Sequence, residues 1–425
     1  MNNVREGYKM TELGEIPNNW EVKKLDEISN ITRLAGAEYS DIWETDDNGT
    51  IIALKGNNIG KNNLILNDIE RITEEMSNRL IRSKLFKNDI VFPCVGTIGK
   101  ATVINEDNKY HINQNIAKIT PSSGINSLYL SYYLMSDFTV KEIFKYNTSS
   151  SQPNVLVGNL RKFNIIVPST EEQEKIASIL SIVDEQIDNV DALIEKNKEL
   201  KKGLMQTLLT KGIGHTKFKK TEIGEVPSEW YIKSIDEITK EVYRYPTYYG
   251  IEYVEEGIAE IRGELLNDDA SIKKESFRYI SEKTAKKFPR TKLEGGDIVI
   301  SVRGTIGKVG YITEELAGSN ITANLLRVSM NRNIMNEHFV KQLFLSDIMK
   351  RKFDEITTAT TIKTFKVPEF KQIILAIPTK DEQDKIASIL LEVDKKIEEH
   401  ENKKQKLEEL KKGLMQQLLT GRIRV

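Results

Sequence analysis

Apolar residues recur at alternating steps of four and three along two long stretches of the chain, 171–215 and 381–425. Such heptad spacing, sustained for about four heptads, is typical of a helix that packs along a partner helix. Each pattern covers about 39 residues, which corresponds to roughly 58 Å of α-helix. The seam positions are Ile176, Leu180, Val183, Ile187, Val190, Ile194, Asn197, Lys201, Leu204 and Leu208, then Ile386, Leu390, Val393, Ile397, His400, Lys404, Leu407, Lys411, Leu414 and Leu418.

Pro168 and Pro378 lie just upstream of these stretches, where a proline suits the start of a helix. The first helix leads away from one globular part and the second begins after another, so we expect the helices to pair antiparallel, with approximate two-fold symmetry. Gly203 and Gly413 interrupt both helices at the same point, each at a cost of about 1 kcal/mol relative to alanine. They indicate either the close approach of a partner's backbone or glycines tolerated near a helix end.

Residues 1–170 and 216–380 show short β-rich runs separated by turns that contain glycine and asparagine, the signature of strands. One helical stretch lies among these runs in each part, 126–146 and 336–353. The sequence therefore predicts an α/β (α+β) fold: two similar mixed α/β globular domains separated by two long antiparallel coiled-coil helices.

The chain consists of two tandem copies of one sequence unit. "TELGEIPNNW" returns as "TEIGEVPSEW", "DIVFPCVGTIGK" as "DIVISVRGTIGK" and "EEQEKIASIL" as "DEQDKIASIL", at separations of 210, 208 and 210 residues. The helical stretches 171–212 and 381–422 share 23 of 42 aligned positions, whereas the globular parts keep little beyond the short motifs. The two copies therefore have similar helices but dissimilar globular parts. This pattern predicts a protein with a shared helical scaffold and two different recognition surfaces.

Composition narrows the class of protein. Cys94 is the only cysteine, which excludes an intramolecular disulfide and a cysteine-rich metal site and fits a reducing cytoplasm. The first ten residues lack the apolar core of a secretory signal, and no apolar run reaches the ~18 residues of a membrane span. A net charge of −1 argues mildly against a non-specific nucleic-acid binder.

No catalytic motif stands out. The chain has no methyltransferase [ND]-P-P-[FYW] tetrapeptide, G-x-G-x-x-G cofactor loop, Walker A motif, H-E-x-x-H zinc motif or G-x-S-x-G nucleophile elbow. His400 lacks the neighbouring ligands that a metal requires, and a polar register position in the seam is the simpler interpretation. We therefore predict a recognition and assembly module with no catalytic residues, metal site or cofactor of its own.

Two features of each globular part suit nucleic acid. The "GTIGK" loop at 96–100 and 304–308 lacks the spacing of a nucleotide-binding loop, so a glycine-bearing hairpin turn is the favoured interpretation. The alternative is a turn that presents Lys100 or Lys308, with Arg303 nearby, to a DNA backbone. The polar stretches "NTSSSQPN" (147–154) and "TTATTIKT" (357–364) offer groups for phosphate and base-edge contacts, or are solvated loops.

These motifs together identify a family resemblance. Globular parts opened by T-E-[LI]-G-E-[IV]-P-x-x-W, a helix start P-x-x-[ED]-E-Q-x-K-I-A-S-I-L and a helix end K-K-G-L-M-Q-x-L-L-T resemble the specificity (S) subunit of Type I restriction-modification enzymes over essentially the full chain. The resemblance implies a target recognition domain in 1–170, a spacer helix in 171–215, a second recognition domain in 216–380 and a C-terminal spacer helix in 381–425.

The resemblance also implies partners. Each recognition domain would read one half of a split, asymmetric site in double-stranded DNA, and the helices would bind two methyltransferase (M) subunits. Adenine-N6 methylation would belong to M, and ATP-dependent cleavage to two restriction (R) subunits. S-adenosylmethionine, ATP and Mg²⁺ would be cofactors of those partners, in the cytoplasm and away from any membrane.

Recognition domains diverge where they read DNA, so we choose candidate contacts by residue type and position. Leu204, Met205, Leu414 and Met415 are candidates for packing on M, or pack within the chain. A stand-alone DNA-binding regulator, an unrecognised enzyme with a coiled-coil arm and a non-DNA adaptor or scaffold are the alternatives. The DNA candidates are Lys55, Asn57, Asn58, Lys61, Lys100, Ser149, Ser150 and Gln152 in the first part, and Arg262, Arg303, Lys308, Thr358, Thr360 and Lys363 in the second.

Overall fold

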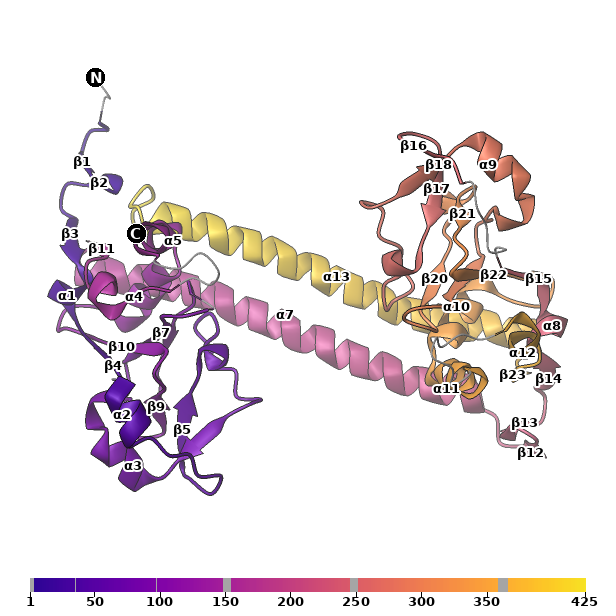
Figure 1. Ribbon diagram of the computed structural model, residues 1–425, viewed down its shortest axis with the longest axis horizontal. Helices are drawn as coiled ribbons and strands as arrows, with labels where there is room; N and C mark the ends of the chain where they lie inside the picture. Colours follow the sequence, from indigo (N-terminus) through magenta and orange to yellow (C-terminus); the bar gives the residue numbers. More distant parts are fainter. Residues whose placement is uncertain (1–3, 35, 97, 148–153, 245–250, 358–365) are drawn as a thin grey trace. The chain divides into compact units, whose positions relative to one another are not determined.

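The computed structural model describes residues 4–34, 36–96, 98–147, 154–244, 251–357 and 366–425 (Figure 1). The chain forms two compact units. The first unit combines residues 1–191 with 402–425, and the second unit comprises residues 192–401. Each unit therefore holds one globular part, the adjoining segment of one long helix and the far segment of the other.

The first unit is built on a four-stranded antiparallel sheet with the order β4-β10-β7-β8. A three-stranded sheet, β6-β5-β9, stands beside it and contains one parallel pair, β5 with β9. Two two-stranded ribbons, β1-β2 and β3-β11, complete the strands. The strands are β1 (Tyr8–Thr11), β2 (Gly14–Pro17), β3 (Glu21–Lys24), β4 (Ser29–Arg33), β5 (Ile51–Leu54), β6 (Glu70–Ile72), β7 (Ile90–Pro93), β8 (Thr102–Val103), β9 (Tyr110–Ile112), β10 (Ile116–Pro121) and β11 (Asn164–Val167).

The helices of the first unit include one departure from the expected pattern. The sequence predicted one helical stretch over 126–146, but the structure breaks it at Ser136. The Ser136 hydroxyl donates to the Tyr133 carbonyl. Ser136 has an extended backbone and occupies the N-cap position of the second helix. The helices are α1 (Leu25–Ile28), α2 (Gly36–Asp41), α3 (Glu74–Arg79), α4 (Ser127–Leu134), α5 (Asp137–Tyr146), α6 (Val157–Leu160) and α7 (Thr170–Lys211), with the 3-10 turns η1 (Gly56–Asn58) and η2 (Ile81–Ser83).

The second unit repeats this architecture with its own sequence. Its four-stranded sheet has the order β15-β22-β19-β20, and a second sheet has the order β16-β18-β17-β21 with β17 and β21 parallel. Two ribbons, β12-β13 and β14-β23, correspond to those of the first unit. The strands are β12 (Phe218–Thr221), β13 (Gly224–Pro227), β14 (Tyr231–Ser234), β15 (Thr239–Arg244), β16 (Tyr253–Val254), β17 (Ile258–Ile261), β18 (Arg278–Ile280), β19 (Ile298–Ser301), β20 (Val309–Tyr311), β21 (Asn320–Ile321), β22 (Leu325–Met330) and β23 (Ile374–Ile377).

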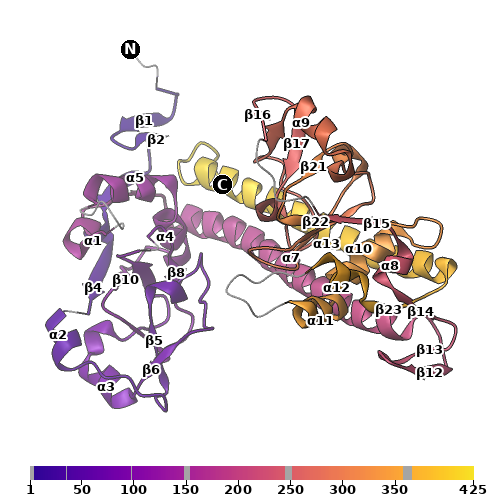
Figure 2. The same ribbon diagram turned by 45° about the vertical axis from the view of Figure 1, so that its right-hand side comes forward.

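The expected helix at 336–353 is also two helices, because Ser346 accepts a hydrogen bond from the Met349 amide and caps a new start. Figure 2 shows α11 and α12 of this unit next to one another. The helices are α8 (Ile235–Ile238), α9 (Glu282–Lys287), α10 (Glu337–Leu345), α11 (Asp347–Ile356), α12 (Val367–Lys371) and α13 (Lys380–Leu418), with the 3-10 turns η3 (Gly263–Leu265), η4 (Pro289–Thr291) and η5 (Glu314–Leu316).

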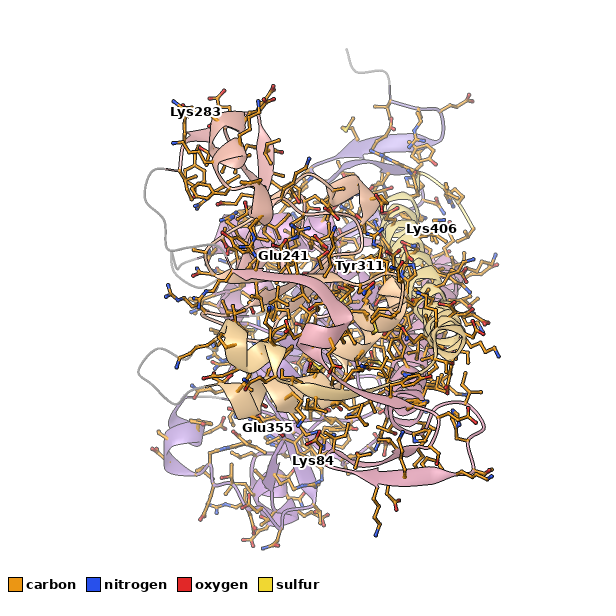
Figure 3. All side chains as sticks on the ribbon, turned by 90° about the vertical axis from the view of Figure 1, so that its right-hand side faces the viewer. Lys84, Glu241, Lys283, Tyr311, Glu355 and Lys406 are labelled. Atoms are coloured by element: carbon orange, nitrogen blue, oxygen red, sulfur yellow. The ribbon has the colours of Figure 1, made fainter. Side chains whose placement is uncertain are left out.

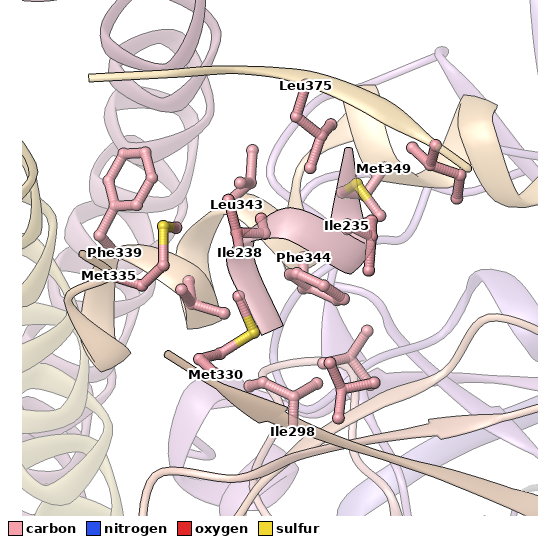
Figure 4. Packing of buried hydrophobic residues seen from close by; sticks show 14 of the residues in the cluster. Ile235, Ile238, Ile298, Met330, Met335, Phe339, Leu343, Phe344, Met349 and Leu375 are labelled. Atoms are coloured by element: carbon pink, nitrogen blue, oxygen red, sulfur yellow. The ribbon is translucent and has the colours of Figure 1, made fainter. Parts of the chain in front are cut away.

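Both cores take in the long helices. In the second unit, Leu208 and Leu209 at the end of α7 and Ile386 at the start of α13 join the main hydrophobic cluster. Figure 4 shows Ile298 of β19 and Phe344 of α10 in that cluster. The first unit mirrors this, because its core contains the start of α7 and the end of α13. Each globular core is thus completed by the two helices together.

Ion pairs define the direction in which α7 and α13 run past each other. In the first unit, Asp184 pairs with Lys411, and Asp191 pairs with Lys404 at 2.7 Å. The partner number falls as the α7 number rises, so the helices are antiparallel, as predicted. No helix among the described residues combines the length and apolar character that a membrane span requires.

Candidate nucleic-acid interface

The "GTIGK" motif forms the same hairpin turn in both units. It joins β7 to β8 and β19 to β20, which are antiparallel pairs. Its two glycines have positive φ in each copy, 81° and 88° for Gly96 and Gly99 and 76° and 80° for Gly304 and Gly307. Residues that carry a side chain rarely adopt this left-handed backbone conformation, so each turn requires glycine at both positions. The predicted hairpin is therefore confirmed.

In the first unit the turn gathers other segments that the sequence singled out. Val95, directly before the turn, forms a β-bridge with Asn154, the last residue of the polar stretch 147–154. Directly after the turn, the Ala101 carbonyl accepts from the Asn62 amide at 2.8 Å, which ties down the loop that carries Lys61. Three candidate segments far apart in sequence therefore meet at one end of the four-stranded sheet.

The second unit also brings the corresponding segments near its turn, but through different contacts. Lys308 of the turn donates its Nζ to the Leu266 carbonyl at 3.3 Å, next to the loop that carries Arg262. A β-carbon on Gly307 would meet the Phe353 ring at 3.2 Å, so the end of α11 packs closely on the turn. Thr357, the first residue of the second polar stretch, in turn bonds the Phe353 carbonyl at 2.6 Å.

The candidates of the first unit differ in their freedom to bind DNA. Asn57 and Lys61 are exposed, and Lys100 is half-buried. Lys55 lies 3.1 Å from Asp68 and 3.5 Å from Glu70, and the hydrogen bond with Asp68 raises the pKa of Lys55. Asn58 is buried, and its side chain bonds the Lys55 amide and the Ile65 and Asp68 carbonyls. The structure thus gives Asn58 an internal role, because these bonds hold the loop in shape. Ser149, Ser150 and Gln152 lie outside the described residues.

The candidates of the second unit show a similar division. Arg303 is exposed on the turn. Arg262 bonds Glu264 at 2.5 Å and the Ser276 carbonyl at 2.6 Å, so much of its guanidinium serves the fold. Lys308 also lies 3.7 Å from Asp268. Thr358, Thr360 and Lys363 lie outside the described residues.

Sequence reasoning missed two further side chains beside each turn. Arg33 and Asn115 in the first unit correspond to Arg244 and Asn324 in the second. The signal was present but weak: an isolated arginine and an isolated asparagine recur at separations of 211 and 209 residues. Only the strand register shows that each pair occupies equivalent places.

The four residues considered for packing on a partner face inward in part. Leu204 and Met205 pack against the core of the second unit, and Leu414 and Met415 pack against that of the first. Beside them, Gly203 and Gly413 are exposed, and a β-carbon added to either would meet no atom of the described chain within 4 Å. Within the part of the chain that the structure describes, then, no close backbone approach explains these glycines.

The helix starts carry a second matched feature. The Trp20 indole donates to Glu172 at 2.9 Å, and the Trp230 indole donates to Glu382 at the same distance. Both glutamates lie in the first turn of a long helix. These bonds join the W of the opening motif to the E of the E-Q motif, which accounts for two of the repeated sequence signatures as structural ties. Among the described residues, no group of three or more His, Cys, Asp or Glu could hold a metal ion.

Comparison with known proteins accounts for this arrangement. The family model of the Type I restriction modification DNA specificity domain matches twice, at residues 17–201 and 216–409. A protein of Methanocaldococcus jannaschii named as the type I restriction enzyme MjaX specificity subunit is 28% identical over 99% of this chain and 97% of its own length.

Two solved structures share the fold. The S subunit of the M. genitalium Type I restriction-modification system has a TM-score of 0.56 at 17% identity, covering 96% of this chain and 99% of that one. A chain from a study of assembly and conformational transition of the type I system has a TM-score of 0.60 at 15% identity, with the same coverage. The two domain matches, which span most of the sequence, show that this chain belongs to the Type I restriction modification DNA specificity family, as a non-catalytic subunit that recognises DNA.

Proposed function

We propose that residues 1–170 and 216–380 each read one half of a split, asymmetric site in double-stranded DNA, within a complex that also contains methyltransferase and restriction subunits. The observation that carries the proposal is one surface built twice with different side chains. In both units the turn, the loop and the described end of the polar stretch lie near one another, but Val95 stands where the second unit has Arg303. Shared architecture with changed side chains suits two domains that read different bases.

Helices α7 and α13 are proposed to hold two methyltransferase subunits, which methylate adenine at N6, one on each strand. Two restriction subunits would add ATP-dependent cleavage. S-adenosylmethionine, ATP and Mg²⁺ are assigned to those partners, and this chain is proposed to work without a cofactor in the cytoplasm. The repeated helix ends support two equivalent partner sites, because Gly203 and Gly413 are both exposed beside partly buried Leu and Met residues.

The decisive experiment maps DNA methylation by long-read sequencing in cells that make this chain together with its methyltransferase subunit. We expect a two-part motif with a fixed gap that carries N6-methyladenine on both strands only when this chain is present. No new motif from a soluble complex would contradict the proposal and favour an adaptor that does not bind DNA. Tight, sequence-specific binding by the chain alone, without any methylation, would favour a stand-alone regulator.

A further inference from the structure

One arginine occupies the same register position in the two main sheets. Arg33, the last residue of β4, lies opposite Ala117 of β10. Arg244, the last residue of β15, lies opposite Leu326 of β22. Both arginines are half-buried at the end of the sheet.

A buried ion pair next along the strand shows that the two registers are equivalent. Lys118 follows Ala117 and lies 3.2 Å from Asp89, and Arg327 follows Leu326 and lies 2.7 Å from Asp297. Both cations also donate to a backbone carbonyl of the preceding loop. All four side chains are buried. Arg33 and Arg244 are therefore true counterparts, set by strand register and not by loose alignment.

An exposed asparagine stands beside each arginine. The Asn115 carbonyl accepts from the Cys94 amide at 2.8 Å, and the Asn324 carbonyl accepts from the Val302 amide at 2.9 Å. Cys94 and Val302 come two residues before the "GTIGK" glycine in each unit. This bond fixes each asparagine against the base of the turn and leaves its side chain at the surface.

The positive charges of Arg33 and Arg244 have no described carboxylate to balance them. Among the described residues, neither Arg33 nor Arg244 forms an ion pair with a carboxylate. The Arg33 Nε donates a hydrogen bond to the Gln114 carbonyl, which holds the arginine side chain in place. Burial and the nearby Arg303 guanidinium lower the pKa of Arg244, so two like charges are held close together. A DNA phosphate bound by Arg244 would relieve this repulsion.

We propose that Arg33 with Asn115, and Arg244 with Asn324, form one DNA-phosphate contact in each unit, identical in the two half-site readers, and that Arg303 adds a contact specific to the second half-site. This inference rests on the proposed function. The two half-sites differ in bases but share the phosphate backbone. A group kept in both repeats therefore suits the backbone, and a group that changes suits the bases. Arginine and asparagine side chains are both common phosphate donors.

The test measures DNA binding by the complex of this chain with its methyltransferase subunit across a range of salt concentrations. The two duplexes are one that carries the mapped motif and one that lacks it. We expect Arg33→Ala and Arg244→Ala each to weaken binding to both duplexes about fivefold at 0.15 M salt and to make the salt slope less steep by about 0.9. The methylated motif should stay unchanged. Lys283→Ala, on exposed α9 (Figure 3), is the matched loss of one charge and should leave binding unchanged.

Arg33→Met and Arg244→Met remove the charge but keep the aliphatic packing, so they control for misfolding of the alanine variants. They should weaken DNA binding and reduce the salt slope to the same extent. Arg303→Val, which installs the residue of the first unit, should relax only the second half of the methylated motif. Unchanged affinity and salt slope in the Arg33 and Arg244 variants, while the parent complex binds DNA, would overturn this inference alone. A parent complex that binds neither duplex would overturn the proposed function as well.

Discussion

Lys201 of α7 lies with its Nζ 2.6 Å from the Asp394 carboxylate of α13, and the same pair recurs as Lys411 with Asp184. Both lysines occupy positions that the heptad pattern assigns to the apolar seam. A charged residue at such a position costs packing, but it selects the register in which it finds its partner. Gln342 also donates to Asp394, and Tyr132 donates to Asp184, so each carboxylate ties the helix pair to its globular core.

Lys201→Met should therefore destabilise the chain although it makes the seam more apolar. The change leaves Asp394 without its cation, and we expect the free energy of unfolding to fall by about 1–3 kcal/mol. The exchange Lys201→Asp with Asp394→Lys should recover most of that loss. Chemical denaturation followed by circular dichroism of the full chain gives the values.

Lys198→Met provides the control for this prediction. Lys198 lies 3.8 Å from Glu401, and both side chains are about half exposed, at 49% and 54%. Exposed pairs of this kind contribute less than ~1 kcal/mol, so the change should have little effect. An equal loss in both variants would show that Lys201 does not act through Asp394.

Glu172 predicts a pH-dependent contribution to the stability of the first unit. Burial alone would raise the pKa of Glu172, but hydrogen bonds from Arg424, Trp20 and Ser169 outweigh it and lower that pKa. A carboxyl whose folded pKa lies below the ordinary 4.5 stabilises the fold fully above 4.5. That stabilisation is lost as the pH falls through the folded pKa.

Glu172→Gln should thus lower the melting temperature at pH 7, and its difference from the parent chain should shrink as the pH falls below 4.5. Thermal melts from pH 7 to well below pH 4.5 measure the difference. Glu171→Gln is the matched control, because Glu171 is 78% exposed and its one ion pair among the described residues is with Lys175. A difference for Glu172→Gln that is constant across the pH range would contradict the charge-based explanation.

The exposed glycines of the two helices separate stability from assembly. A β-carbon at Gly203 or Gly413 meets nothing within the described chain, and alanine favours a helix by about 1 kcal/mol over glycine. Gly203→Ala and Gly413→Ala should therefore raise the melting temperature of the chain alone. If a methyltransferase backbone packs closely there, the same changes should weaken assembly, which size-exclusion chromatography with the partner detects. Full assembly with both alanines would identify them as glycines tolerated near a helix end.

The fold was largely predictable because its strongest signals are periodic. The heptads located the starts of α7 and α13 to within one residue, and the internal repeat predicted two equivalent globular parts. The breaks at Ser136 and Ser346 escaped, because a serine cap inside an apolar helical run is a weak signal until the turn is seen.

The site was less predictable, because surface chemistry depends on tertiary partners. Asn58 and Arg262 have suitable side chains for DNA, yet internal hydrogen bonds occupy them. Arg33 and Arg244 look unremarkable in sequence, and only strand register brings them beside matching turns. Residue type selected segments that the structure brings near each turn. It did not distinguish side chains that face outward from side chains that hold loops in shape.

Exchange of one globular part tests whether the two globular parts recognise their half-sites independently. Residues 216–380 contribute the whole strand framework of the second unit, whereas the first unit uses only residues 1–191 and 402–425. Replacing 216–380 with the corresponding part of another family member should therefore change one half of the methylated motif and leave the other half unchanged.

The exchange should keep the helix ends that complete each core, because Leu208 and Leu209 pack into the second unit. A control exchange that reinstalls the chain's own residues 216–380 through the same junctions should restore the original motif. Motif mapping by long-read sequencing reads both halves at once. A change in both halves would mean that the two parts do not read DNA separately, since a reader confined to one unit has no means of altering the bases contacted by the other.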